Sequence, residues 1–466
     1  MQPLKLNRDS LTDRVERSLR QRILSGKLAP EVWREAAEGL FARLGSGLGV
    51  EGYPAAVKLL QRRSPAAQQT AFNALLREMD ACYEAVLQSR RRRRYQQATT
   101  SLWHLQKMLS EAHGLTQEAW ADSVRGVWDH EGYGLFPGDW EATAATLARY
   151  GISDIFLLVA TADTTHATVP GLTPTMLRRD HGDQLAQASR AARRHGLRLH
   201  AWIAAFSTHG VSAARRGELA KEGRLMLDQA GKPLNWLDPA HAANRTRLRE
   251  TARHLVTNYD IDGIHLDYIR YADYPSSLGS NVRAAFEKKT GRRIRNWPRD
   301  VDPEKGRHAA AFMKYRAEIV TEVVGDLRLT LRRIAPEARL SASVYGRYPL
   351  CADSVGQDWM LWLRRDLIDY AAPMNYTDDL KRYRDLLADQ VATPKLRSRI
   401  LSGIGVTAAE SYLDAHAVMQ QIDVARQQGF GGYVLFDLDA TLRLEILPFL
   451  RLGINRDRSP SPQAIK

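Results

Sequence analysis

The sequence predicts an α/β protein: a (β/α)8 TIM barrel preceded by an N-terminal all-helical region. From Arg125 onward, short apolar runs typical of buried parallel strands recur eight times. These runs are Gly126–Trp128, Ile152–Ala160, Leu197–Phe206, Gly263–Ile269, Leu340–Val344, Tyr370–Asn375, Ile400–Val406 and Gly432–Phe436. Helical patterns separate them, for example at Trp140–Arg149, His181–His195, Phe312–Arg333 and Ala415–Gln428. Eight such units over about 310 residues fit a barrel with insertions, because this fold usually takes about 250. An open doubly wound sheet is the alternative, but no Gly-x-Gly-x-x-Gly motif follows the first run.

Residues 1–120 are expected to form a helical region of their own. Phe72–Gln88 carries apolar residues at helical spacing, and Gln96–Ala112 predicts a second helix, so that the two form an antiparallel hairpin. Leu11–Ser25 and Glu31–Leu44 are also helix-like. No group of residues here suggests catalysis, and binding or packing is the expected role. We place the barrel at residues 121–453 and expect the tail, residues 454–466, to be disordered.

The composition is that of a globular protein. Of the 466 residues, 44% are hydrophobic, which is an ordinary share. No run of about 18 apolar residues occurs, so no transmembrane segment is expected. The N-terminus lacks the apolar core of a signal peptide, which leaves the localisation unknown. Cys82 and Cys351 lie far apart, so that neither a disulfide framework nor a thiolate metal site is expected. The sequence does not predict the oligomeric state.

The charge is strongly basic and unevenly distributed. The formal net charge is +14, and residues 1–120 hold 19 Lys and Arg against 12 Asp and Glu. Arg90–Arg94 is a run of five arginines. Such a run is either a binding patch for an anionic polymer, a nucleic acid or a membrane surface, or a solvated junction between helices. Because no aromatic residues are interleaved with it, no nucleic acid is expected as a partner.

The active site of a barrel of this kind lies at the carboxyl ends of its strands. Charged, polar and aromatic residues follow the predicted strands. They are Asp129, His130 and Glu131; Asp163 and His166; Ser207, Thr208 and His209; Asp267, Tyr268, Arg270 and Tyr271; Tyr345 and Arg347; Asn375, Tyr376, Asp378 and Asp379; Thr407; and Asp437 and Asp439. The histidines show neither His-x-His nor His-Glu-x-x-His spacing, so no metal is expected. No Gly-x-Ser-x-Gly elbow occurs, and no cofactor is expected.

Carboxylates with neighbouring aromatic residues are what the hydrolysis of carbohydrates requires. Two carboxyl groups flank the scissile bond, one as the acid and the other as the nucleophile or base. The faces of Trp128, Trp202, Tyr271 and Tyr376 are candidates for stacking on the apolar faces of sugar rings. The alternative is that these aromatic side chains fill the rim of the barrel.

The segment Tyr259–Tyr271, with sequence Tyr-Asp-Ile-Asp-Gly-Ile-His-Leu-Asp-Tyr-Ile-Arg-Tyr, closely resembles a signature of the glycosyl-hydrolase-like family 10 proteins. This group includes the divisome-associated peptidoglycan glycan hydrolases. Further blocks agree in order: Arg125–Trp128, Trp236–His241, Gln357–Trp359 with Trp362, and Asp369–Thr377. The resemblance extends over roughly Val124–Leu450 and leaves the helical region outside. It implies a (β/α)8 glycoside hydrolase that acts on a polysaccharide, commonly in the bacterial envelope, such as peptidoglycan glycan strands or an amino-sugar polymer.

The same segment resembles, more distantly, the Asp-Gly-x-Asp-x-Asp-x-Glu motif of chitinase-like barrels. Aligned on Asp262 and Gly263, Asp267 takes the place of the last aspartate, His265 replaces the first of the inner pair, and Ile269 replaces the catalytic glutamate. The general acid of the chitinase mechanism is therefore missing from this segment. An acid for sugar hydrolysis must come from another strand.

Asp267 is the predicted catalytic carboxylate, as the nucleophile or as the group that stabilises an oxocarbenium ion. An ion pair with Arg270 is the alternative role. Three carboxylates qualify as the acid by position: Asp378, Glu131 and Asp437. Asp358, in contrast, is a candidate N-cap of a helix that starts at Trp359.

The predicted substrate-binding residues are Trp128, Trp202, His265, Arg270, Tyr271, Tyr345, Asn375 and Tyr376. His265 lies two positions before Asp267 and so on the same side of its strand, where it either orients Asp267, binds a sugar hydroxyl or fills the core. The sequence thus predicts a glycoside hydrolase. The alternative is a glycan-binding barrel without catalysis, anchored through the basic helical region.

Overall fold

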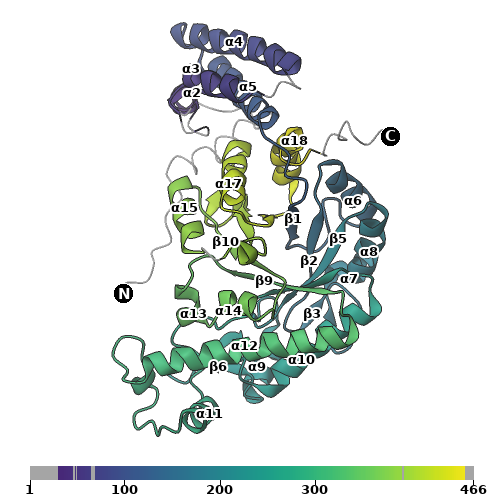
Figure 1. Ribbon diagram of the computed structural model, residues 1–466, viewed down its shortest axis with the longest axis vertical. Coiled ribbons are helices and arrows are strands. Elements are labelled where there is room, and N and C mark those ends of the chain that lie inside the picture. Colours follow the sequence, from purple (N-terminus) through teal and green to yellow (C-terminus); the bar gives the residue numbers. More distant parts are fainter. Residues whose placement is uncertain are drawn as a thin grey trace.

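The computed structural model describes residues 30–42, 44–45, 48, 50–64, 69–390 and 393–456. Eight parallel strands close into a barrel in the ring order β1, β14, β11, β10, β9, β8, β5, β2, with β2 paired back to β1 (Figure 1). Their bounds are β1 Val124–Asp129, β2 Asp154–Ala160, β5 Arg198–Ala204, β8 Gly263–Asp267, β9 Arg339–Tyr345, β10 Tyr370–Met374, β11 Leu401–Gly405 and β14 Gly432–Phe436. Each predicted run contains or overlaps one of these strands, and the predicted barrel is confirmed.

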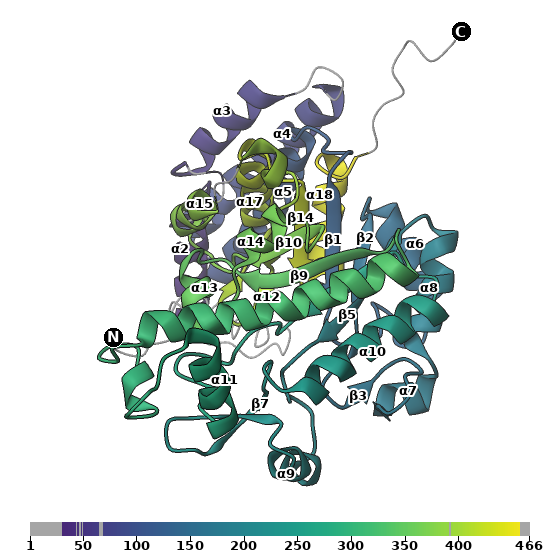
Figure 2. The same cartoon turned by 60° about the horizontal axis from the view of Figure 1, so that its bottom comes forward.

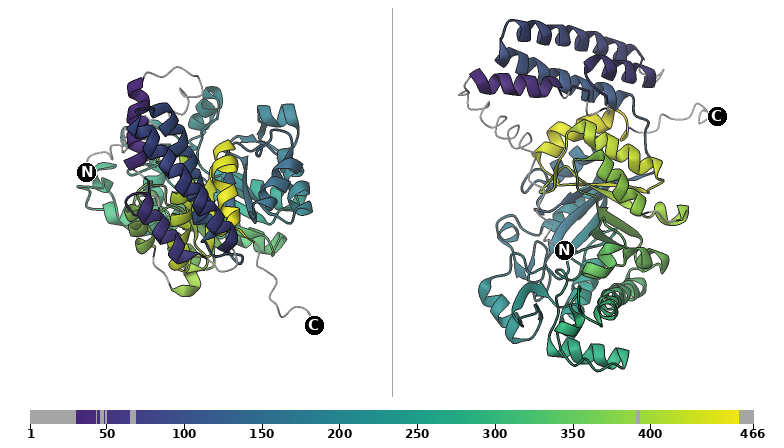
Figure 3. Two further views of the ribbon diagram at one scale, coloured as in Figure 1. Left: turned by 90° about the horizontal axis from the view of Figure 1, so that it is seen from above. Right: turned by 90° about the vertical axis from the view of Figure 1, so that its left-hand side faces the viewer.

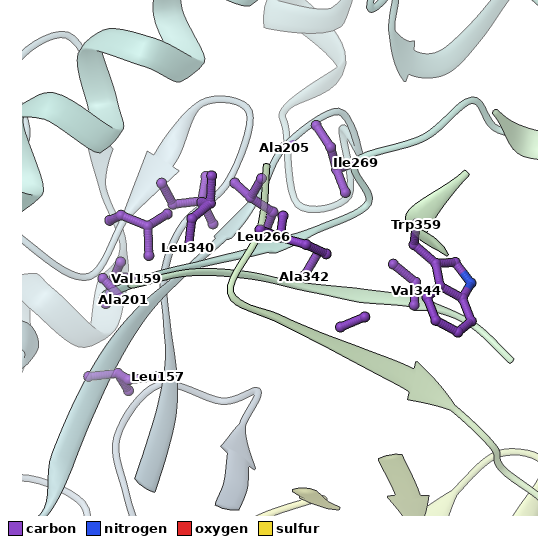
Figure 4. Close-up of a cluster of buried hydrophobic side chains, with 14 of the residues drawn as sticks. Leu157, Val159, Ala201, Ala205, Leu266, Ile269, Leu340, Ala342, Val344 and Trp359 are labelled. Carbon is purple, nitrogen blue, oxygen red and sulfur yellow. The ribbon is translucent and has the colours of Figure 1, made fainter. Parts of the chain in front are cut away.

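The strands are apolar because both of their faces are buried. Every residue of β2 is buried, and its side chains alternate between two cores. Phe156 and Leu158 point into the barrel, where they join Trp128 and Trp202. Leu157 and Val159 belong to the core between the strands and the surrounding helices. Figure 4 shows part of this outer core, with Leu157, Val159, Ala201, Leu266, Leu340 and Ala342 along neighbouring strands.

Helices surround the barrel strands. Five of them match predicted patterns: α6 Trp140–Arg149, α8 Gln184–Arg194, α12 Ala309–Ile334, α14 Trp359–Arg364 and α17 Ala415–Gln427. The others are α10 Ala242–Asn258, α15 Leu380–Asp389 and α18 Leu447–Leu452, which follows a π-helical turn at Leu442–Ile446. Asp358 caps α14 by accepting a hydrogen bond from the amide of Leu361 at 3.2 Å. The N-cap role expected for Asp358 is therefore confirmed.

Insertions extend the loops that follow the barrel strands. The insertion after β2 holds β3 Thr164–Thr165, β4 Thr173–Pro174 and α7 Met176–His181, and the one after β5 holds α9 Ala213–Lys221, β6 Leu225–Leu227 and β7 Pro233–Leu237. The insertion after β8 holds α11 Ser280–Thr290 and a 3-10 turn at Arg299–Val301, and α13 Leu350–Val355 follows β9. The short helix α16 Pro394–Arg397 precedes β11, and β12 Thr407–Ala408 and β13 Ser411–Tyr412 follow it. Figure 2 shows α9, β7 and α11 together at one end of the molecule. These loops supply side chains to the mouth of the barrel.

Four helices form the described part of the N-terminal region: α2 Pro30–Ala42, α3 Tyr53–Arg63, α4 Gln69–Arg91 and α5 Tyr95–Leu115 (Figure 3). The predicted helices Phe72–Gln88, Gln96–Ala112 and Glu31–Leu44 correspond to α4, α5 and α2. The region has an apolar core of its own, which includes Phe72, Met79 and Leu102. The predicted helix Leu11–Ser25 and residues 457–466 of the predicted disordered tail lie outside the described residues.

The helical region packs on one side of the barrel, where α5 meets α17 and α18 (Figure 1). His113 of α5 and His416 of α17 are both buried, and their Nδ1 atoms lie 3.2 Å apart. Next to them, a Cβ at Gly114 would lie 2.7 Å from the carbonyl oxygen of Phe449. Because α5 and α18 lie so close here, position 114 requires glycine, which has no Cβ.

Candidate active site

Asp267 and Asp437 lie at the ends of strands on opposite sides of the barrel. Asp267 is the last residue of β8, and Asp437 directly follows β14. In the ring order these strands are four steps apart in either direction. Because the carboxyl ends of parallel strands share one end of the barrel, both carboxyl groups are at its mouth. Asp437 is thus the one of the three predicted acids whose strand faces Asp267 across the barrel.

Asp267 is 8% exposed, and burial raises the pKa of its carboxyl group from 3.8 to about 6. The amide of Tyr268 donates a hydrogen bond of 2.6 Å to it. Arg270, His130 and the indole of Trp202 also stabilise the charged form and limit the rise of the pKa. The alternative role of Asp267 as an ion-pair partner is not realised, because the Nη1 of Arg270 donates to the carbonyls of Tyr271 and Ala272 instead.

The carboxyl group of Asp437 accepts hydrogen bonds from the amides of His130 at 3.2 Å and Leu438 at 2.7 Å. Burial raises its pKa, and the charge of Asp439 adds to this. The imidazole of His130 lies between the rings of Trp202 and Phe436, at centroid distances of 5.8 and 6.0 Å. Since the charge of His130 lowers the pKa of both Asp267 and Asp437, this imidazole is near both carboxyl groups.

Aromatic rings form the floor of the mouth. Tyr376 follows β10 and stacks on Phe436 at a centroid distance of 5.5 Å, and the rings of Trp128 and Tyr376 meet edge to face at a centroid distance of 6.5 Å. Burial raises the pKa of Tyr376 well above its ordinary 10.0, and the charges of Asp267 and Asp437 add to the effect. The phenol of Tyr376 is therefore within electrostatic reach of both carboxyl groups.

His265 and Trp128 lie deeper in the barrel than the predictions assumed. The indole Nε1 of Trp128 donates to Nε2 of His265 at 2.9 Å, and Nδ1 of His265 lies 2.8 Å from the hydroxyl of Ser341. An indole can only donate, so Nε2 carries no proton and the neutral ring has its proton on Nδ1. Burial keeps the pKa of His265 well below 6.5. Of the roles considered for His265, the core role is the one that the structure supports. Trp128 is 1% exposed and offers no face to a sugar.

Three further predicted substrate-binding residues are buried. Tyr271 is 0% exposed and lies under the guanidinium of Arg316, away from the mouth. Asn375 is also 0% exposed, and its amide nitrogen donates to Ser402 at 3.1 Å. Trp202 is 3% exposed, and its indole lies beside Asp267, whose charged form it stabilises. Trp202 therefore lines the site with its edge, whereas Tyr271 and Asn375 support the loops around it.

Glu131 and Asp378, the other predicted acids, are both exposed. Glu131 lies 3.9 Å from Nδ1 of His130 and so is at the edge of the mouth. Asp378 precedes Asp379, which caps α15. Tyr345, which ends β9, is 37% exposed and stacks on the guanidinium of Arg270.

Four residues near the mouth were not among the predicted catalytic or substrate-binding residues, although Tyr268 and Asp129 were among the strand-end candidates. Trp236 and Tyr268 pack against each other and against Arg270. Glu410, at the tip of the β12–β13 hairpin, raises the pKa of both Tyr376 and Tyr268, after burial and nearer groups. Asp129 accepts hydrogen bonds from the amides of Gly132 and Gly134 at 2.8 and 2.7 Å, and burial raises its pKa to about 7. The position of Asp129 after its strand was a usable signal, whereas none marked Glu410.

Within the part of the chain that the structure describes, no three His, Cys, Asp or Glu side chains come together as metal ligands. In the same residues, no helix combines the length and apolar character needed to cross a membrane.

Carboxyl groups and aromatic rings at the mouth of a (β/α)8 barrel define a protein of the glycoside hydrolase type. The model of the family described as "Glycosyl hydrolase-like 10" matches residues 163–409, just over half of the chain, and the chain belongs to this family. This confirms the resemblance found in the sequence, although the match is shorter than Val124–Leu450.

Solved structures that are similar to this one include the three that follow. The PgaB (BpsB) glycoside hydrolase domain from Bordetella bronchiseptica superimposes with a TM-score of 0.55 at 14% identity, over 67% of this chain and 94% of that one. The catalytic domain of a β-amylase from Paenibacillus polymyxa gives a TM-score of 0.49 at 13% identity, over 70% and 94%. A GH18 chitinase from Cycas revoluta gives 0.43 at 12% identity, over 71% and 99%. A comparison with curated proteins finds no match.

Proposed function

We propose that this protein is a glycoside hydrolase that cleaves O-glycosidic bonds of a polysaccharide with the carboxyl pair Asp267 and Asp437. The observation that carries the proposal is that these two carboxyl groups end strands on opposite sides of the mouth, and that burial raises the pKa of each. Glycoside hydrolysis requires two carboxyl groups on either side of the scissile bond, one of them protonated near neutral pH.

The surroundings of the two groups support different roles. Asp267 lies near Arg270 and His130 and accepts the Tyr268 amide, and these partners favour its charged form as the nucleophile or the oxocarbenium-stabilising carboxylate. Asp437 is partly exposed and next to Asp439, and a carboxyl group with a like charge beside it is suited to be the acid. The phenol of Tyr376, near both, would hydrogen-bond the sugar between them.

We further propose that the substrate is a bacterial envelope glycan, such as peptidoglycan glycan strands or another amino-sugar polymer. Membership of the glycosyl hydrolase-like 10 family supports a glycan. The aromatic side chains at the mouth, Trp236, Tyr268 and Tyr345, are only partly buried or exposed and offer ring faces to sugars.

The alternative is a glycan-binding barrel without catalysis, anchored through the basic helical region. Ile269, where chitinase-like barrels have their acid, favours this reading. In the helical region, Arg91–Arg94 are exposed at the turn between α4 and α5, while Arg90 stacks on Phe41. We propose an anionic polymer as the partner of this turn, and residues 1–120 and 121–453 as separate domains because each has its own core.

Release of reducing ends from purified glycans tests the two functions. A hydrolase generates reducing ends from a sensitive glycan, and Asp267→Asn removes nearly all of this activity while the protein stays folded and still binds the glycan. Asp326→Asn, an exposed aspartate on α12, is the matched control and keeps full activity. Glycan binding without any reducing ends on prolonged incubation would favour the non-catalytic barrel. Unchanged turnover in Asp267→Asn would exclude Asp267 as the catalytic carboxylate.

A further inference from the structure

Arg270 is a buried cation held between aromatic rings at the mouth. The residue is 7% exposed, and its guanidinium carbon lies 4.6 Å from the ring centroid of Trp236, 4.5 Å from that of Tyr345 and 5.5 Å from that of Tyr268. Its Nη1 donates to the carbonyls of Tyr271 and Ala272, both at 3.0 Å. The stacked rings and these two bonds fix the plane of the guanidinium.

The other edge of this guanidinium has no acceptor. Nε and Nη2 of Arg270 form no hydrogen bond with the described residues, and no carboxylate among them lies within ion-pair distance. Arg224 and Arg328 are buried to a similar degree, at 8% and 6% exposure, and each lies within 3.1 Å of a carboxylate oxygen. Arg316, at 0% exposure, is enclosed in the core and donates both Nη groups to oxygens there. The free edge of Arg270 has neither a carboxylate nor a neutral acceptor, so an acidic ligand that accepts from Nε and Nη2 would be stabilised there.

The unpaired edge belongs to the proposed active site. The charge of Arg270 lowers the pKa of Asp267, which places the guanidinium near that carboxyl group. Tyr345, one of the rings around Arg270, is 37% exposed, so the ring cluster opens to solvent. Trp236, on β7, and Tyr268, next to Asp267, complete the cluster. A sugar bound at Asp267 would therefore meet both ring faces and a guanidinium with free N–H groups.

We propose that Arg270 determines specificity by binding a carboxylate carried by a sugar of the substrate, so that the substrate is an acidic glycan. The proposal rests on the proposed function and narrows its substrate class. A guanidinium presents parallel N–H groups that match the two oxygens of a carboxylate, whereas the hydroxyl groups of a neutral sugar satisfy them less strongly. Nε–H and one N–H of Nη2 form such a fork on the free edge of Arg270.

The test measures binding apart from turnover, in the full chain carrying Asp267→Asn. The probes are peptidoglycan glycan strands freed of their peptides, whose lactyl groups end in carboxylates, and the same strands after these carboxylates have been reduced to alcohols. The acidic strands are expected to bind at least about 10-fold more tightly. Adding Arg270→Gln removes this preference by weakening only the acidic strands, and Arg270→Lys, which keeps the charge but not the fork, restores part of it. Arg333→Gln, at an exposed position on α12, leaves the preference unchanged.

Equal binding of the two forms, binding of neither, or an equal loss for both in Arg270→Gln would overturn the proposal. The last result would mean that Arg270 only supports the structure. Turnover by the protein with Asp267 intact separates this proposal from the hydrolase proposal. Reducing ends released equally from both forms contradict the role of Arg270 and leave the hydrolase standing. Binding that depends on Arg270 but yields no reducing ends contradicts the hydrolase proposal and leaves the role of Arg270 standing.

Discussion

Asp267 and Asp437 end two strands that lie opposite each other in the eight-stranded ring, and His130 lies near both of their carboxyl groups. The backbone amide of His130 donates to Asp437, while its ring packs between Trp202 and Phe436. The residue after β1 thus connects the two carboxyl groups. Ile269 stands where chitinase-like barrels have their catalytic glutamate and cannot act as the acid. Asp437, after the last strand of the barrel, is available for this role.

Replacing Asp267 with asparagine should stabilise the protein at pH 7. The folded-state pKa of about 6 lies above the ordinary 3.8, so the folded state holds a proton that the unfolded state has lost between about pH 4 and 6. Folding stability therefore falls as the pH rises through this window, by roughly 3 kcal/mol in total. Asparagine carries no charge and avoids this loss.

Thermal unfolding of Asp267→Asn and the parent protein between pH 4 and 8 measures this effect. The melting temperature of the variant should exceed that of the parent at pH 7, and the difference should vanish near pH 4. Asp326→Asn, which is exposed, should show no such trend. A difference independent of pH would mean that Asp267 is not a buried carboxyl group with a raised pKa.

Replacing Asp437 with asparagine should affect substrates according to their leaving groups. If Asp437 is the acid, Asp437→Asn lowers kcat/KM for a glycan by roughly 100- to 10,000-fold, because a sugar leaving group needs a proton. An aryl glycoside with an acidic phenol needs little help and should lose much less. Asp378→Asn, which changes an exposed carboxylate, should alter neither substrate by more than a few-fold. The opposite ranking of the two variants would assign the acid to Asp378.

Replacing Trp128 with phenylalanine should destabilise the protein. The change removes the indole donor to Nε2 of His265 inside the barrel, where the Ser343 hydroxyl at 2.8 Å remains as a partner, and the loss of one such hydrogen bond costs about 0.5–1.5 kcal/mol. Trp103→Phe is the matched control, since Nε1 of Trp103 is buried without a partner and its loss should cost less. Chemical denaturation of the two variants compares these costs. A larger loss in Trp103→Phe would contradict the assigned bond.

Gly114 and Gly39 should respond to alanine with opposite signs. A Cβ at Gly114 would lie 2.7 Å from the Phe449 carbonyl oxygen, so Gly114→Ala should separate α5 from α18 and lower the melting temperature. Nothing lies within 4 Å of a Cβ at Gly39, inside α2, so Gly39→Ala should stabilise the protein by about 0.5–1 kcal/mol. Stabilisation by Gly114→Ala would mean that the helical region does not dock as described.

The barrel could be predicted from the sequence because its strands are short and buried on both faces. Gly432–Phe436 and Trp140–Arg149 were predicted with the bounds that the structure gives. The helix α3 was missed because only Tyr53, Ala56 and Leu60 of its residues are buried, which is too weak a pattern to recognise. The hairpin β6–β7 was missed because β6 has only three residues and only the last residue of β7 is buried.

The site could be predicted in part. Position after a strand was enough to select Asp267 and Asp437. Alternation along a strand says on which side a residue lies but not how deep in the barrel it is. His265, two residues before Asp267, lies one layer further from the mouth, where it contacts Trp128. Tyr271 lies beyond the end of its strand, where the period of two no longer sets its direction, and it packs on Arg316.

Incorporation of oxygen from water shows whether Asp267 and Asp437 carry out hydrolysis. Glycan is incubated with the protein in water enriched in oxygen-18, and the products are analysed by mass spectrometry. Hydrolysis through Asp267 and Asp437 predicts one oxygen-18 atom at each new reducing end with the unmodified protein, and nearly none with Asp267→Asn or Asp437→Asn under the same conditions. Products without the label, or labelled products formed equally fast by the two variants, would contradict the account.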